Sequence, residues 1–130
     1  MQDRPSAQEL LDAVRLFLAT ELLPTVSDPR LRFRTLIAAN LLDMLRRELA
    51  LEPDLLAAEY ARLATLLGEQ RPAPAEPRAL AAAVAELQRA LCQLIRAGRA
   101  PDGSLTAVLA GVRAKLEIAN PRYLADFEPI

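Results

Sequence analysis

Apolar residues recur every three or four positions through most of this chain, in segments that prolines separate. This spacing places side chains on one face of an α-helix. No segment alternates apolar and polar residues as a half-buried β-strand would. The sequence therefore predicts an all-α fold, an antiparallel bundle of about five helices with short connections.

Capping residues and prolines give the expected limits of the first two helices. Ser6 and Glu9 form the sequence of a capping box, and the helix that they begin should end at Pro24. A second helix is expected from Pro29 to about Ala50, with Asp28 as its N-cap. Its apolar residues cover more than half of its circumference, which is typical of a central helix that is packed on several sides.

Three further helices are expected after that point. The third should start near Pro53 and end near Gly68, and the proline-rich segment at about 69–77 then reads as a stiff connector. The fourth should run from about Pro77 to Ala97, with a narrow apolar seam formed by Leu80, Val84, Leu87, Leu91 and Leu94.

Ser104 is the expected cap of the fifth helix, and Pro121 should end it. An extended tail with Tyr123, Leu124 and Phe127 should follow. The connector separates a three-helix half from a two-helix half, but neither half is large enough to stand alone. Residues 1–130 are therefore expected to form a single helical domain.

The composition excludes most enzyme chemistries. The chain has no histidine, so serine–histidine and cysteine–histidine systems are impossible and the commonest metal ligand is missing. Its four glycines are scattered singly and form no phosphate loop. We expect a protein that is not an enzyme and that holds no metal or cofactor. The single cysteine, Cys92, is expected to be a small buried hydrophobe rather than a reactive thiol.

Net charge and hydropathy limit the classes of partner that the chain is expected to have. A net charge of −1 argues against a nucleic-acid binder. No apolar stretch is long enough to span a bilayer, so no membrane is expected. The first residues, MQDRPSAQEL, carry charge and proline where a secretory signal needs an apolar run. A cytoplasmic location is the expectation.

Two polar residues fall on apolar faces of the second helix. Asn40 lies between Leu36 and Phe33 in helical angle, and Arg47 lies two turns further on. A buried polar group needs a partner, because an unsatisfied one costs about 1–3 kcal/mol. Three interpretations stay open for Asn40: a hydrogen bond to a helix-end carbonyl such as the one near ANPRYL, a contact with a ligand or partner, or a place at the margin of the face.

The run DPRLRFR places Arg30, Arg32 and Arg34 in the first turns of that helix. A helix N-terminus attracts anions, so a phosphate or carboxylate site and a solvated basic patch are both open. Glu21, which intrudes on the apolar face of the first helix, could pair with one of these arginines. Surplus apolar helix surface, including the alanine-rich flank of the fourth helix, indicates self-association, with a homodimer expected.

Three stretches together resemble a known family: RPSAQELLDAVRLFL, AANLLDMLRREL and KLEIANPRYL. It is a family of small, uncharacterised bacterial all-helical proteins, commonly encoded beside aminoglycoside-phosphotransferase-like kinases and acyl-CoA dehydrogenases. The resemblance implies that Asn40, Arg47, Glu48, Asn120 and Pro121 match the family's recurrent positions. It also implies an accessory role in acyl-CoA metabolism, with the kinase or the dehydrogenase as a partner.

Two functions remain from the sequence. The first is a non-catalytic interaction protein that self-associates and binds a partner enzyme. The second is a small-ligand module for acyl-CoA or another anion, with Arg30, Arg34 or Arg47 as the anion contact.

Overall fold

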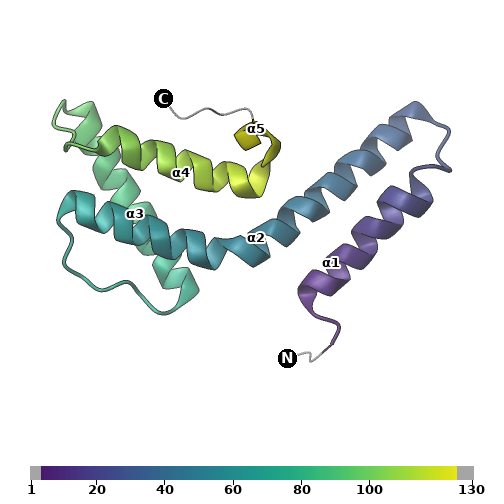
Figure 1. Cartoon of the computed structure of the whole chain (residues 1–130), viewed down its shortest axis with the longest axis horizontal. Coiled ribbons are helices and arrows are strands. Elements are labelled where there is room, and N and C mark those ends of the chain that lie inside the picture. The colour runs from purple at the N-terminus through teal and green to yellow at the C-terminus, as the bar shows by residue number, and fades with distance from the viewer. Residues whose placement is uncertain (1–3, 126–130) are drawn as a thin grey trace. The chain divides into compact units, whose positions relative to one another are not determined.

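The structure, a computed structural model, describes residues 4–125 (Figure 1). Every regular element in that range is helical, so the prediction of an all-α fold is confirmed. The elements in chain order are α1 (Ala7–Leu16), the π-helical turn η1 (Phe17–Leu22), α2 (Pro29–Leu67), α3 (Pro77–Arg96), α4 (Ser104–Ala119) and α5 (Arg122–Ala125).

The chain forms two compact units, and α2 contributes to both. Unit 1 contains the residues up to Leu51 together with Ile118–Asn120, and unit 2 contains Glu52–Glu117 and the residues from Pro121 onward. The expectation of a single domain stays a prediction.

In unit 1, α1 and the first half of α2 run antiparallel (Figure 1). The capping box at the start of α1 is confirmed: the Ser6 amide donates to the Glu9 carboxylate at 2.7 Å, and the Glu9 amide donates to Ser6 Oγ at 3.2 Å. These two bonds satisfy amides that the first helical turn leaves without partners.

The turn between α1 and α2 is closed by side chains as well as backbone. The Leu23 amide donates to the Leu18 carbonyl at 2.9 Å, which is the five-residue bond of a π-turn. Asp28 Oδ1 accepts from the Arg30 amide at 2.8 Å, so Asp28 caps α2 as predicted. Arg32 Nη1 donates to the Leu23 carbonyl at 2.8 Å and fastens the turn.

Pro53 lies inside α2, so the predicted break after Ala50 and the new helix at Pro53 are both wrong. Proline removes one backbone hydrogen bond and crowds the preceding turn. The surrounding sequence, ELALEPDLLAAEYARL, consists almost entirely of strong helix formers. Residues that follow Pro53, Tyr60 and Leu63 among them, are buried in the core of unit 2. This burial holds the helix in place beyond the proline.

The core of unit 2 forms where α2 packs against α3. Leu63 is the most deeply buried side chain, and it is joined by Tyr60 and Ala64 of α2 and by Leu80, Val84, Leu87 and Leu91 of α3. Four of the five predicted seam residues of α3 are therefore buried, and Leu94 is half-buried. α4 runs antiparallel beside the second half of α2 (Figure 1), and its Ala107 is buried.

The connector and the end of the chain complete unit 2. The Tyr60 hydroxyl donates to the Arg71 carbonyl at 2.8 Å and holds the connector against α2. α4 ends at Ala119, before Pro121. The expected extended tail is wrong at Tyr123 and Leu124, which form the short helix α5. Phe127 lies outside the described residues.

Candidate functional site

One face of α2 in unit 1 is apolar and exposed. Thr35 and Ala39 are buried, and Arg46 on the same face reaches Asp12 of α1. The opposite side, here called the outer face, carries Phe33, Leu36, Ile37, Asn40, Leu41 and Leu45, all of them exposed. The expectation of a central helix packed on several sides is therefore wrong for this half of α2.

Asn40 lies in the middle of the outer face and is exposed. Its side chain makes no hydrogen bond within residues 4–125. The structure therefore does not give Asn40 the helix-end carbonyl that the sequence suggested. A contact between Asn40 and a ligand or partner stays a prediction.

Arg47 makes the bond to a helix end instead. Its Nε donates to the Ile118 carbonyl at 2.7 Å, in the last turn of α4, and its Nη1 donates to Asp43 Oδ2 at 2.6 Å. A helix-end carbonyl near ANPRYL does accept a side-chain hydrogen bond, but the donor is Arg47 rather than Asn40. Both bonds occupy Arg47, so a role in binding a separate anion gains no support.

Asp43 is the centre of an ion-pair cluster between α1 and α2. Arg46 Nη2 lies 3.1 Å from Asp43 Oδ1, and Arg15 Nε of α1 lies 3.9 Å from the same oxygen. Burial raises the pKa of Asp43, but the hydrogen bond from Arg46 and the charges of Arg47 and Arg46 outweigh it, so the pKa falls below 3.8. The cluster links α1 to α2 through Arg15 and Asp12 of α1.

The remaining predicted residues are placed as follows. Arg30 and Arg34 are exposed on the first turns of α2, and within the described residues neither side chain forms an ion pair. Glu21 is exposed and makes no ion pair with the nearby arginines. Glu48 is half-buried, and Asn120 and Pro121 are exposed after the end of α4.

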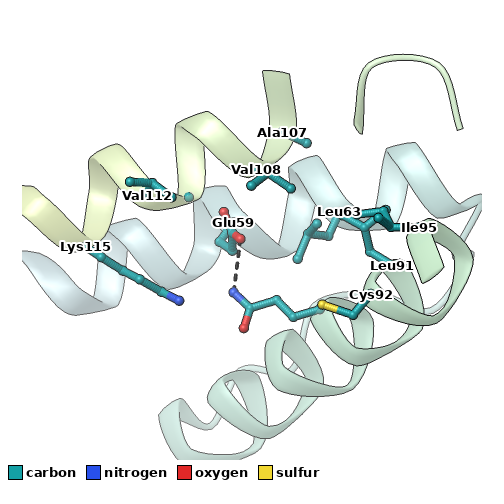
Figure 2. Close-up of a pocket in the computed structure, with 11 residues that line it drawn as sticks. Glu59, Leu63, Leu91, Cys92, Ile95, Ala107, Val108, Val112 and Lys115 are labelled. Atoms are coloured by element: carbon teal, nitrogen blue, oxygen red, sulfur yellow. Dashed lines mark hydrogen bonds between the residues drawn. The ribbon is translucent and has the colours of Figure 1, made fainter. Parts of the chain in front are cut away.

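A groove of about 200 Å³ lies in unit 2, between α2, α3 and α4. Figure 2 shows Lys115 and Val112 toward one end of it, Glu59 nearer the middle, and Leu63, Leu91 and Ile95 toward the other end. The groove walls come from α2 (Glu59, Leu63), α3 (Gln88, Leu91, Cys92, Ile95) and α4 (Ala107, Val108, Gly111, Val112, Lys115).

Glu59 is the buried charge of the groove, with 8% of its surface exposed. Its carboxylate accepts hydrogen bonds from Arg62 and from Gln88 Nε2, the latter at 3.2 Å and drawn as the dashed line in Figure 2. Gly111 of α4 lies directly against it, because a Cβ at that position would come within 3.0 Å of Glu59 Oε1. The glycine lets the carboxylate approach the α4 backbone.

Sequence reasoning missed Glu59 because acids are seldom buried. The available signal was its position four residues after Leu55 and four before Leu63, within the apolar arc of α2. The expectation that Cys92 is a small buried hydrophobe is wrong, since its side chain is exposed and lines the groove. It lies one position past the buried seam residue Leu91, where the α3 surface turns outward.

The described residues also bear on metal binding and on membrane insertion. No group of three or more His, Cys, Asp or Glu within residues 4–125 is arranged to hold a metal ion. None of the described helices combines the length and the apolar character that crossing a membrane requires.

Comparison with known proteins places the chain in a family. No protein with a curated description and no solved structure matches it. The model of a family that is described as a domain of unknown function matches residues 24–123, which include all of α2, α3 and α4. This agrees with the resemblance to an uncharacterised helical family. The chain belongs to the family whose model matches it, DUF6285.

Proposed function

We propose that this protein is a non-catalytic interaction protein that self-associates through the outer face of α2. The observation that carries the proposal is the exposure of five large apolar side chains on this face, from 42% at Ile37 to 62% at Phe33. Together they offer roughly 400–500 Å² of apolar surface. That is about half of the ~800 Å² that each partner buries in a stable interface, and an apolar patch of this size on a monomer is often functional.

Asn40 favours a second copy of this chain as the occupant. An amide both donates and accepts hydrogen bonds, so two Asn40 side chains can pair across a twofold axis. A single polar residue within an apolar helix contact sets the register and the number of copies, at a cost in stability. The outer face shows this pattern, with Asn40 between Phe33 and Leu45.

The charges beside the outer face favour an antiparallel pair. With the axis at Asn40, a residue that precedes position 40 lies near the residue that follows position 40 by the same count in the second copy. Arg34 and Arg30 precede Asn40 by six and ten residues, and Glu48 follows it by eight. At about 1.5 Å per residue, Glu48 of one copy therefore falls within about 3 Å along the axis of both arginines of the other.

Cross-linking tests the register of this pair. In a Cys92→Ser background, Asn40→Cys should form an intermolecular disulfide on mild oxidation. Phe33→Cys should not, because two such residues lie about 21 Å apart along an antiparallel pair. A parallel pair would cross-link at both positions and would contradict the arrangement. A protein that stays monomeric by analytical ultracentrifugation at every concentration would overturn the proposal itself.

Substitution tests the surface. Leu41→Glu should abolish association because it places a charge within the contact. Leu105→Glu in α4 is the matched control, since Leu105 is 73% exposed and belongs to unit 2 rather than to the outer face. Asn40→Leu should still associate but should give a mixture of oligomers, because the register determinant is gone.

The family resemblance supplies a class of second partner, the kinase or acyl-CoA dehydrogenase encoded beside such genes, and with it an accessory role in acyl-CoA metabolism. The test is binding of the purified neighbouring kinase to wild-type protein and to the Leu41→Glu and Leu105→Glu variants. Binding of none of the three would remove the accessory role and leave self-association standing.

The second candidate, an acyl-CoA or other anion module, ranks below the first. Arg47 is engaged by Asp43 and by the Ile118 carbonyl, so only Arg30 and Arg34 of the three predicted anion contacts stay exposed. Calorimetric titration with acyl-CoA should give no heat above dilution. Saturable binding that Arg30→Met and Arg34→Met weaken would favour this candidate instead.

A further inference from the structure

We propose that the groove of unit 2 binds a small zwitterion, an α-amino acid with an aliphatic side chain. The groove belongs to unit 2 and the outer face of α2 to unit 1, so this inference does not depend on the proposed self-association. Three properties of the groove support the proposal: the order of its charged side chains, the free hydrogen-bond acceptor positions of the Glu59 carboxylate, and the small volume of the groove.

Helix α4 sets the order of groups along the groove. Lys115, Gly111 and Ala107 are spaced by four residues, so they lie on one face of α4 over about 12 Å. Gly111 lies against the Glu59 carboxylate. Along this face a cation therefore comes first, an anion second, and the apolar wall at Ala107 and Val108 last.

The other two helices repeat the same polarity. In α2, Glu59 is followed one turn later by Leu63, and in α3, Gln88 is followed by Leu91 and Ile95. Figure 2 shows Glu59 and Lys115 grouped apart from Leu63 and Ile95. The groove has its charged side chains toward one end, which Val112 also lines, and is apolar at the other end, and this division fits a ligand with the same polarity.

The Glu59 carboxylate keeps the capacity to accept a further donor. A carboxylate offers about four lone-pair directions. Arg62 and Gln88 occupy two of them. The α4 backbone at Gly111 covers one side of the carboxylate, and Glu59 also lines the groove. An ammonium group there makes a charge-assisted hydrogen bond to a carboxylate that is itself buried.

The order of cation, anion and apolar wall matches the order of groups in an amino acid. Its carboxylate pairs with Lys115, its ammonium with Glu59, and its aliphatic side chain with the wall at Leu63, Val108 and Ile95. A carboxylic acid without an ammonium group would place its hydrocarbon chain against the Glu59 carboxylate. An amine without a carboxylate would place its ammonium group near Lys115 and would leave the lysine without an anion to pair with. The volume of about 200 Å³ is below the ~300–1,000 Å³ of drug-sized pockets, so the ligand is small.

Calorimetric titration with leucine tests the proposal, with 4-methylpentanoic acid, isopentylamine and glycine as the comparison ligands. Leucine should bind saturably. Each of the others should bind at least about tenfold more weakly, because it lacks one of the three contacts. An absence of leucine binding at millimolar concentration would overturn the proposal. So would equal binding of the acid or the amine.

Variants locate the site. Lys115→Met should weaken leucine binding by about tenfold or more, while Arg113→Met, an exposed position of α4 outside the groove, should leave it unchanged. Lys115 is exposed, so its substitution leaves the core intact. Glu59→Gln keeps the shape of the side chain, removes the charge, and should also weaken binding. Leucine binding that survives both groove substitutions would place the ligand elsewhere and contradict the inference.

Discussion

At the scale of single residues, Gly111 determines how close the Glu59 carboxylate lies to α4. A glycine inside a helix costs about 1 kcal/mol relative to alanine. Alanine at this position, however, would place its Cβ 3.0 Å from Glu59 Oε1. The carboxylate cannot retreat freely, because Arg62 and Gln88 hold it and it is buried. We therefore expect the steric penalty to exceed the gain in helix propensity.

Gly111→Ala is accordingly predicted to lower the free energy of unfolding by about 1 kcal/mol. The same substitution in a Glu59→Ala background should raise it by up to about 1 kcal/mol, because the clash is gone and only the propensity gain remains. Urea unfolding of the four proteins measures both effects. A gain in stability in both backgrounds would mean that the carboxylate moves aside without penalty.

Tyr60 makes a second prediction at this scale. It is 5% exposed, and its hydroxyl donates to the Arg71 carbonyl in the connector. Tyr60→Phe should lower stability by about 1 kcal/mol and should speed amide hydrogen exchange around residues 69–76. Tyr123→Phe is the control, since that ring is 65% exposed, and it should change neither quantity. Unchanged exchange in Tyr60→Phe would show that the connector is held by other contacts.

At the scale of elements, ionised Asp43 contributes to the pairing of α1 with α2, beside the ion pair of Asp12 with Arg46. Its pKa is lowered in the folded protein from a value of 3.8, so the folded state binds its proton less readily than the unfolded chain. The stabilisation is complete above pH 3.8 and is lost as the pH falls below that value through the folded pKa. Asp43 is then neutral, so it no longer forms ion pairs with Arg46 and Arg15.

The stability difference between wild type and Asp43→Asn should follow this titration. Wild type is predicted to be more stable at neutral pH, and the two curves should converge as the pH falls below 3.8. Other carboxyl groups titrate in both proteins, so the difference isolates Asp43. Urea unfolding followed by circular dichroism across this range measures it. A difference that does not depend on pH would exclude the charge of Asp43 as the cause.

Pro53 gives the other prediction for an element. It lies in the interior of α2, where proline costs about 3 kcal/mol relative to alanine, partly offset by the restricted unfolded chain. Pro53→Ala should therefore raise the free energy of unfolding by about 1–3 kcal/mol. It should also increase the magnitude of the helical circular dichroism signal. Unchanged stability would mean that α2 is interrupted at this position in solution.

At the scale of the whole molecule, self-association predicts a thermal midpoint that depends on concentration. Association stabilises the folded state by mass action, so the midpoint of wild type should rise with protein concentration. The midpoint of Leu41→Glu should not, while that of Leu105→Glu should rise as in wild type. Differential scanning calorimetry over a wide concentration range measures this. A constant midpoint in wild type would contradict the proposed dimer.

Local signals in the sequence predicted the all-α class, the caps at Ser6 and Asp28, and most of the α3 seam, because each of these depends on neighbouring residues. The continuation of α2 past Pro53 was missed, since it is secured by burial of residues that follow the proline. Helical angle placed Asn40 in an apolar arc, but it could not show whether another helix covers that arc.

The groove was beyond prediction for a similar reason. Glu59 of α2, Gln88 of α3 and Gly111 of α4 meet only after three helices have packed, and no sequence spacing links them. The one local hint was an acid among leucines, and by itself such an acid is usually on the surface.

The contact between Gly111 and Glu59 also restricts how the family can vary. The hydrogen of the glycine and the carboxylate of the acid share one small space, so the two positions should change together in evolution. A family member that keeps the acid is expected to keep the glycine. A member with any larger residue at the position of Gly111 is expected to have lost the carboxylate, and with it the capacity to hold an ammonium group.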